Sequence, residues 1–346
     1  MPGCSRGLPP ATQGSSGAGG MCAAVTLVLL FLLLLLLLLP RLWRRGAVPL
    51  EPPGRAVLIT GCDSGFGHFL ALRLHRLGFT VFAGCLCPSG DGAQRLQREA
   101  GGSGRLHVLQ LDVTSARDVL AAKELVLSHL PERGFWGLVN NAGISTFGET
   151  GWLPMEKYER VADVNLLGSI RTTLEFLPLL RKYKGRIVFM SSINAYFTLA
   201  NGIYSMTKAA IEKFCDALRL EMKKFGVQVC VIQPGNYARF TKIQPPLSAE
   251  EIWNELSEEE KTVYNKEYVQ ERANFFNSIL SEGSTKGDEV VDAMVDALMS
   301  PAPKARYMVA KLKEKALVFV CALFPTVVMD SVLSYALSKV KLGTIQ

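Results

Sequence analysis

The chain has 346 residues, of which 49% are hydrophobic and 20% charged, with a net charge of +7. These proportions fit a folded domain with a well-filled core and exclude a disordered chain. Residues 1–55 hold five arginines against one glutamate, so +4 of the net charge lies there, and no basic stripe interleaved with aromatic residues follows. Nucleic acid is therefore not an expected partner. The eight cysteines and four histidines lack ligand spacing, so no metal site is predicted.

The N-terminal segment has the pattern of a tail followed by a membrane anchor. Residues 1–22 are rich in Gly, Ser and Pro, which predicts a flexible tail, and Met21 is an alternative start site. An uncharged, leucine-rich run over 23–39 is at the short end of what spans a bilayer, and three arginines follow it. Charge after the run favours a retained anchor over 23–45 with the body on the cytoplasmic side. A cleaved organelle leader is the alternative, disfavoured because the run is not amphipathic.

A glycine-rich turn lies between the first predicted strand and the first predicted helix of the body. Ala56–Thr60 is short, apolar and β-prone, and residues 68–77 have apolar side chains at helical spacing. Between them stands Gly61-x-x-x-Gly65-x-Gly67, which differs from the commoner G-x-G-x-x-G. Glycines allow a pyrophosphate to approach the backbone, and a helix N-terminus supplies N–H groups. This context predicts a nucleotide-binding turn.

Apolar runs then alternate with helical patterns along the chain. Strands are predicted at 80–86, 105–113, 136–139, 185–190 and 227–232, and helices at 156–180 and 288–299. This alternation predicts an α/β fold, a Rossmann-like doubly wound parallel sheet, in a single catalytic domain over 55–300. Ligands bind such sheets at the carboxyl ends of the strands.

Polar residues follow several of these strands. Asp112 closes the third strand, where it could accept a bond from an adenine amino group or cap the following helix. Asn140–Gly143 could pass closely under a flat ring or form a plain β-turn. Asn165 lies between apolar neighbours inside the helix at 156–180, so its amide should be buried and needs a partner.

Tyr204 and Lys208 stand four residues apart, which puts both side chains on one face of a helix. A cation beside a phenolate lowers the pKa of the phenol. A general acid–base works best with a pKa near the operating pH, so the pair could exchange protons with a substrate. An ordinary amphipathic helix is the alternative for this pentapeptide alone.

The C-terminal third is helical by pattern. Residues 237–284 are charged and aromatic and are expected to form a substrate lid or cleft wall, with a peripheral helical pair as the alternative. Residues 301–346 form an apolar, membrane-associated segment. Within it the run 316–329 is too short to span a bilayer, which favours a membrane-surface helix or the wall of an apolar substrate entrance.

Taken together in order, these motifs resemble the short-chain dehydrogenase/reductase family from about residue 55 to 235. The runs Gly61–Gly67 and Trp136–Gly143 are similar to the branch of membrane-associated retinol and hydroxysteroid dehydrogenases and D-3-hydroxybutyrate dehydrogenase. The run Gly143–Glu149 looks most like the hydroxybutyrate enzyme, whereas the twelve-residue spacing from Ser192 to Tyr204 matches the retinol type.

The resemblance implies a role for each matching residue. Tyr204 is the proton donor or acceptor, and Lys208 lowers its pKa and binds the nicotinamide ribose. Ser192 holds the substrate oxygen, with Ser191 as a minor rival, and Asn165 fixes a water in a proton relay. Besides Tyr204 and Lys208, the implied cofactor-binding residues are Gly61, Ser64, Gly65, Phe66, Gly67, Asp112, Asn140, Ala142, Gly143, Pro234 and Gly235.

The resemblance also implies an activity. The expected enzyme is an NAD-dependent oxidoreductase that interconverts a secondary alcohol and a ketone, with D-3-hydroxybutyrate as the leading substrate and Arg239 as a candidate cation for its carboxylate. Hydroxysteroid or retinol oxidation at the endoplasmic reticulum is the alternative, and a non-catalytic scaffold is a further one. The leucine-rich anchor fits the endoplasmic reticulum better than the mitochondrial inner membrane. A homo-oligomer is usual in the family.

Overall fold

A computed structural model describes residues 27–28, 31, 50–199, 201–241 and 243–338. The chain divides into two units, Met1–Pro49 and Leu50–Gln346. The tail predicted over 1–22 and almost all of the anchor predicted over 23–45 lie outside the described residues. None of the helices in the described ranges is both long enough and apolar enough to cross a bilayer.

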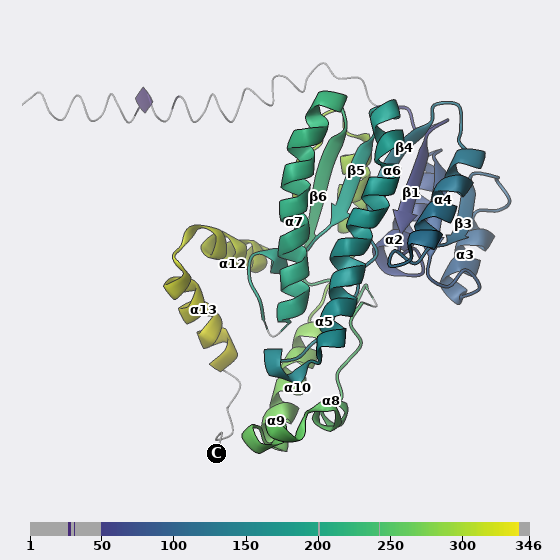
Figure 1. Cartoon of the computed structure of the whole chain (residues 1–346). Coiled ribbons are helices and arrows are strands. Elements are labelled where there is room, and N and C mark those ends of the chain that lie inside the picture. The colour runs from purple at the N-terminus through teal and green to yellow at the C-terminus, as the bar shows by residue number, and fades with distance from the viewer. Residues whose placement is uncertain (1–26, 29–30, 32–49, 200, 242, 339–346) are drawn as a thin grey trace, which may run out of the picture. The chain divides into compact units, whose positions relative to one another are not determined.

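The second unit is built on a seven-stranded sheet in which every neighbouring pair of strands is parallel (Figure 1). The strand order is β3-β2-β1-β4-β5-β6-β7, so the direction of winding reverses between β1 and β4. A crevice forms at such a reversal, outside the carboxyl ends of the strands. The strands are β1 (Ala56–Thr60), β2 (Thr80–Cys85), β3 (Leu106–Gln110), β4 (Phe135–Asn140), β5 (Arg186–Met190), β6 (Gln228–Pro234) and β7 (Arg306–Val309).

Helices cover both faces of this sheet, which explains why the central strands are buried along their whole length. One face packs against α2 (Gly65–Arg76), α3 (Asp91–Glu99) and α11 (Asp288–Met299). The other face packs against α4 (Ala116–Ser128), α6 (Ser169–Tyr183) and α7 (Gly202–Met222). The predicted doubly wound sheet is confirmed.

The structure corrects the predicted strands at one edge. Six strands match their predicted positions within three residues, but β7 was not predicted. It has four residues, of which only Tyr307 is buried, and prolines precede it, so its sequence resembles a loop. Pairing with β6 and ion pairs from Arg306 to Glu212 (3.2 Å) and Asp216 (2.8 Å) hold it in the sheet.

The long helical region predicted at 156–180 is present but contains a change of helix type. It consists of α5 (Met155–Ala162), a π-helical segment η3 (Asp163–Gly168) and then α6. Asn165 lies in the π-helical segment. Such segments shift the backbone hydrogen bonds of a helix and occur often near functional sites.

Three helices follow β6 as expected for residues 237–284: α8 (Ala249–Glu255), α9 (Glu258–Val263) and α10 (Lys266–Ser281). They form a small core of their own with Phe147 and Trp152. After β7 the described chain ends with α12 (Leu312–Leu323) and α13 (Thr326–Ser338), separated at Pro325. Short helical turns complete the second unit: η2 (Thr150–Trp152), η4 (Ile193–Ala195) and η5 (Lys223–Phe225).

Candidate active site

A cavity of about 820 Å³ opens at the carboxyl ends of β1, β4, β5 and β6. Its size is that of a site for a cofactor or drug-sized ligand. Twelve of the fifteen residues predicted for the site line it. They are Gly61, Ser64, Gly65, Phe66, Asp112, Ala142, Gly143, Ser192, Tyr204, Lys208, Pro234 and Gly235.

The glycine turn forms one wall because side chains could not fit there. Gly61 has φ = +70°, and a Cβ on it would lie 2.8 Å from the Cα of Ala142. Gly67 does not line the cavity, but a Cβ on it would overlap the carbonyl oxygen of Gly61 and the side chain of Asn141. Gly61 therefore lets the turn pack against the loop after β4, and Gly67 keeps α2 close to the turn.

Asp63, which was not predicted to take part, connects this turn to the end of β2. Its carboxylate accepts hydrogen bonds from the backbone N–H groups of Leu86 (2.9 Å) and Cys87 (3.0 Å), and it lines the cavity. The sequence signal was an acidic residue inside the glycine turn. An anionic side chain therefore lies on the cavity wall at the end of β2, and at the end of this strand an acidic residue favours a ribose hydroxyl whereas a cation favours a 2′-phosphate.

Asp112 lines the cavity and does not cap the helix that follows it. One carboxylate oxygen accepts from the backbone N–H (2.9 Å) and hydroxyl (2.8 Å) of Thr114. The N-cap of α4 is Ser115, which accepts from the N–H of Asp118 at 3.2 Å. The prediction that Asp112 could cap this helix is therefore wrong, and Asp112 lies on the cavity wall, where the alternative prediction requires it.

The two asparagines after β4 have different environments. Asn140 is buried behind the cavity, where its Nδ2 donates to Thr173 Oγ1 at 2.9 Å and its Oδ1 has no partner among the described residues. Asn141 lines the cavity and donates to the carbonyl oxygens of Thr60 (2.9 Å) and Gly61 (3.0 Å). The structure thus places Asn141, rather than Asn140, at the nucleotide-binding turn.

Asn165 also lies behind the cavity, and its buried amide has the partners that the sequence required. Nδ2 donates to the carbonyl of Ile144 (2.9 Å) and to Thr207 Oγ1 (3.1 Å), while Oδ1 accepts from the N–H of Ile144 (2.9 Å). The side chain therefore ties the loop after β4 to α7. Its predicted role in holding a water stays a prediction.

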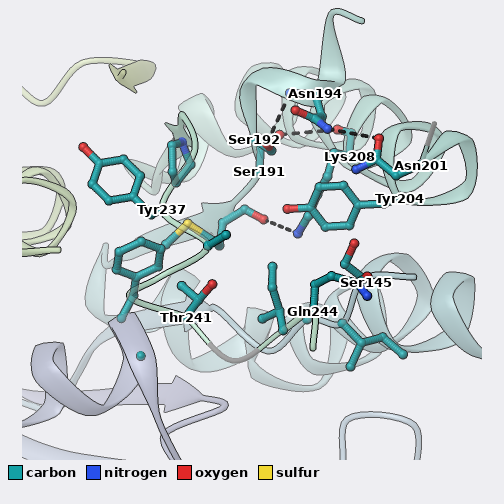
Figure 2. Close-up of a pocket in the computed structure, with 18 of the residues that line it drawn as sticks. Ser145, Ser191, Ser192, Asn194, Asn201, Tyr204, Lys208, Tyr237, Thr241 and Gln244 are labelled. Carbon is teal, nitrogen blue, oxygen red and sulfur yellow. Dashed lines mark hydrogen bonds between the residues drawn. The ribbon is translucent and has the colours of Figure 1, made fainter. Parts of the chain in front are cut away.

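The candidate catalytic groups meet between β5 and α7. Figure 2 shows Ser192, Tyr204 and Lys208 on one side of the pocket, with Thr241 and Gln244 across from them. The Ser192 hydroxyl lies close enough to the Tyr204 phenol to lower the pKa of the phenol. Lys208 Nζ donates to the carbonyl of Met190 at 2.9 Å and lies 5.4 Å from the ring centre of Tyr204.

The structure separates the two candidate serines. The hydroxyl of Ser191 is buried and donates to Glu212 Oε1 at 2.8 Å, within the protein interior. The hydroxyl of Ser192 accepts from the backbone N–H of Asn194 at 3.2 Å and contacts Tyr204. Ser192 is therefore the serine that can share a substrate oxygen with the phenol.

Burial controls the protonation of the catalytic pair. It raises the pKa of Tyr204 to about 12, opposed by the hydrogen bond with Ser192. Burial lowers the pKa of Lys208 to about 8. The hydrogen bond with Ser192 favours the phenolate in this arrangement, and the lowering of the Tyr204 pKa by Lys208 stays a prediction. At neutral pH the phenol holds its proton and the ammonium is charged.

The remaining wall comes from the segment after Ser192, the loop after β6, α10 and α12, and much of it is apolar. The charged side chains on this wall are the carboxylates of Glu282 and Glu314. Arg239, proposed from the sequence as a cation for a carboxylate substrate, is exposed and does not line the cavity. The apolar side chains of this wall include Phe197, Leu199, Ile243, Phe276, Leu280 and Leu317.

Comparison with known proteins gives consistent results. Residues 55–252 match the family described as short chain dehydrogenase. Mitochondrial D-beta-hydroxybutyrate dehydrogenase of Rattus norvegicus is 45% identical over 261 residues, covering 73% of this chain and 76% of that protein. Retinol dehydrogenase 7 of Mus musculus is 38% identical over 303 residues, which cover 86% of this chain and 93% of that protein.

Solved structures share the fold. A short chain dehydrogenase/reductase from Burkholderia phymatum, solved in complex with NAD, has a TM-score of 0.63 and 20% identity, covering 79% of this chain and 94% of its own. At this identity the likeness shows the fold alone. The match to the family over more than half of the sequence shows that this chain is an oxidoreductase of the short-chain dehydrogenase family.

Proposed function

We propose that this protein is an NAD-dependent dehydrogenase that interconverts an alcohol and its carbonyl compound, and that the alcohol is neutral and apolar, of the hydroxysteroid or retinol type. The observation that carries the substrate class is the apolar wall beside Ser192 and Tyr204, whose charged side chains are both carboxylates. Removing a carboxylate substrate from water is unfavourable without a paired cation.

The residues of the glycine turn fit NAD. Gly61 lines the cavity and packs directly against Ala142, where a Cβ would not fit, and the N-terminus of α2, which can bind a pyrophosphate, follows in the same turn. The carboxylate of Asp63 at the end of β2 favours a free ribose hydroxyl over a 2′-phosphate. When bound, the dinucleotide supplies a hydride acceptor and a positively charged ring.

The roles of the catalytic residues follow from their contacts. The Ser192 hydroxyl and the Tyr204 phenol would both hydrogen-bond the substrate oxygen, because each lines the cavity and they contact each other. In carbonyl reduction the Tyr204 phenol donates its proton to that oxygen, and in oxidation the phenolate form of Tyr204 accepts one. Lys208, fixed by the Met190 carbonyl, places a positive charge beside the phenol and stabilises the phenolate whenever it forms.

A substrate panel tests the proposal. The purified full-length protein would be assayed with NAD and equal concentrations of hydroxysteroids, retinol and D-3-hydroxybutyrate. We expect kcat/KM for at least one neutral lipid alcohol to exceed that for hydroxybutyrate by roughly 100-fold or more, since an unpaired buried carboxylate costs several kcal/mol. Preferential turnover of hydroxybutyrate would contradict the proposed substrate class, while leaving the dehydrogenase assignment intact.

D-3-hydroxybutyrate is the second candidate, and the identity to the rat enzyme favours it. It requires a cation in the cavity. Arg160 of α5 lines the cavity and is exposed, so it could approach a carboxylate that Arg239 cannot. The sequence alone ranked this substrate first, and the carboxylates on the cavity wall are the reason for placing it second here.

We also propose that α12 and α13 lie on a membrane, as expected for the segment 301–346. Large apolar side chains on these helices are exposed, among them Phe319 (60%) and Leu323 (65%), and three lysines stand at the start of α12. This combination is typical of helices that lie in a lipid interface. The anchor at 23–45, the orientation towards the cytoplasm, the location at the endoplasmic reticulum and the homo-oligomer stay predictions.

A tryptophan scan would test the membrane contact. In the full-length protein on vesicles with brominated acyl chains, Leu323→Trp should show more fluorescence quenching than the native tryptophans alone, because bromine quenches only indoles within the lipid. Leu220→Trp on α7 is the matched control, since Leu220 is equally exposed (73%) but belongs to the domain surface. Equal quenching in both variants would count against a lipid contact at α12.

A further inference from the structure

The loop after β6 is fixed by a residue that lies about eighty positions later in the chain. Glu314, in the first turn of α12, accepts a hydrogen bond through Oε1 from the backbone N–H of Asn236 at 3.1 Å. Its Oε2 accepts from the N–H of Lys311 at 2.7 Å, which fixes the orientation of the carboxylate. Glu314 also lines the cavity, beside Pro234 and Gly235.

The contact is close enough to restrict the residue before Asn236. A Cβ on Gly235 would overlap Oε2 of Glu314 and lie 3.0 Å from the Cβ of Ala310. The N–H of Gly235 donates to the carbonyl of Val309 at 2.8 Å, at the end of β7. The segment that runs from β7 into α12 therefore holds this loop against the cavity along two successive residues.

Asn236 also connects the loop to the lid. Its Nδ2 donates to the carbonyl of Ile279 in α10 at 2.6 Å, and its backbone carbonyl accepts from the N–H of Ser284 at 2.8 Å. Its Oδ1 accepts from the N–H of Ala238 at 3.2 Å, which shapes the turn. The cavity loop, the lid helix and the C-terminal helix thus meet at a single residue.

We propose that Glu314 is a positioning residue. While α12 is packed against the loop Pro234–Gly235–Asn236, Glu314 holds this loop in the conformation that binds the cofactor. This inference rests on the proposed function, in which the loop contacts the dinucleotide. A hydrogen bond to a charged acceptor is stronger than one between neutral groups. Without Glu314 the N–H of Asn236 loses its hydrogen-bond acceptor, and the loop samples other conformations. Each binding event must then order the loop, which costs free energy and weakens the affinity for the cofactor.

The test compares variants of the full-length protein at this contact. For Glu314→Ala we expect the KM and the Kd for NAD to rise roughly 10- to 100-fold, as for loss of a charged hydrogen bond, with kcat changed much less. The Kd, measured by quenching of protein fluorescence, reports binding independently of turnover. Glu314→Gln should recover part of the affinity, because its amide keeps one acceptor. Lys315→Ala is the control, since Lys315 is exposed on the same helix.

Should Glu314→Ala unfold, the NAD affinities of Glu314→Gln and Gly235→Ala test the inference by themselves, and wild-type affinity in both would overturn it. If Glu314→Ala folds, a double-mutant cycle adds a second test. Gly235→Ala should weaken NAD binding because its new methyl group displaces the carboxylate. In the double variant Gly235→Ala/Glu314→Ala that overlap is gone, so the two effects should not add. Wild-type affinity in Glu314→Ala, or strictly additive effects in the cycle, would overturn the positioning role. Failure of the unmodified protein to bind NAD would instead overturn the proposed function.

Discussion

Tyr204→Phe should lower kcat by roughly 10³-fold or more. A positioned general acid–base typically contributes about 10²- to 10⁴-fold to the rate. The change removes the phenolic oxygen and little else, so the buried ring keeps its packing. Two contributions disappear together: the proton that the carbonyl oxygen receives, and the interaction of the phenol with Ser192. Initial rates with saturating NAD and the best substrate of the panel would measure the loss.

Affinity for NAD should stay within about twofold of the wild type, because the glycine turn and the loop after β6 are unchanged. Tyr196→Phe is the matched control. Tyr196 lies close to the catalytic segment, but its hydroxyl accepts from Gln233 Nε2 at 3.1 Å and does not line the cavity. A Tyr204→Phe enzyme that works at the normal rate would remove the phenol from the mechanism, and an equal loss in both variants would indicate a structural effect.

Lys208→Met should make the protein more stable at neutral pH while it impairs catalysis. Burial lowers the pKa of Lys208 from its ordinary value of 10.5 to about 8. At roughly 1.4 kcal/mol per pKa unit, keeping this lysine charged in the folded state costs about 3 kcal/mol. Methionine fills a similar volume and carries no charge, so the variant avoids that cost.

The sign of the pH dependence follows from proton binding. Below pH 8 Lys208 is charged in both the folded and the unfolded protein, and the full free-energy cost of burying its charge destabilises the fold. Between pH 8 and 10.5 the unfolded chain binds more protons than the folded one, so the wild type gains stability as the pH rises. Above 10.5 the lysine is neutral in both states, and the cost is gone. The advantage of Lys208→Met should therefore shrink by about 3 kcal/mol between pH 7 and 10.5.

Denaturant unfolding of both proteins at several pH values would measure this difference. The loss of the bond to the Met190 carbonyl offsets part of the gain at every pH, so the change with pH is the informative quantity. Lys213→Met is the control, because Lys213 is on the same helix with a side chain that is 87% exposed. A gain that is constant with pH, or the same in both variants, would show that Lys208 is not buried as a charged group.

Features encoded by neighbouring residues could be predicted from the sequence. The strand Ala56–Thr60, the glycine turn and the helix Asp288–Met299 were predicted closely because short apolar runs, glycines and helical periodicity are local signals. The amide of Asn165 was expected to be buried with a partner for the same reason, since its neighbours are apolar. The identity of that partner, the loop at Ile144, required the structure.

Features that depend on contacts between distant segments were missed or misplaced. The strand β7 has no apolar run of its own, and it exists because β6 leaves an open edge and Glu212 attracts Arg306. The family pattern assigned Asn140 to the cofactor site, but its buried side chain donates to Thr173 on α6 and does not line the cavity. Arg239 was a reasonable cation by sequence position, yet its side chain lies outside the cavity.

The sequence by itself determined the chemistry of this protein, because the phenol and ammonium of Tyr204 and Lys208 share one helix and the glycines share one turn. Only the tertiary structure decided which side chains line the cavity beside that pair and what holds the loop after β6. The cavity wall and the Glu314 contact join residues from the loop after β5, from α10 and from α12. Such distant segments meet only when the sheet is assembled, so no local pattern records their contact.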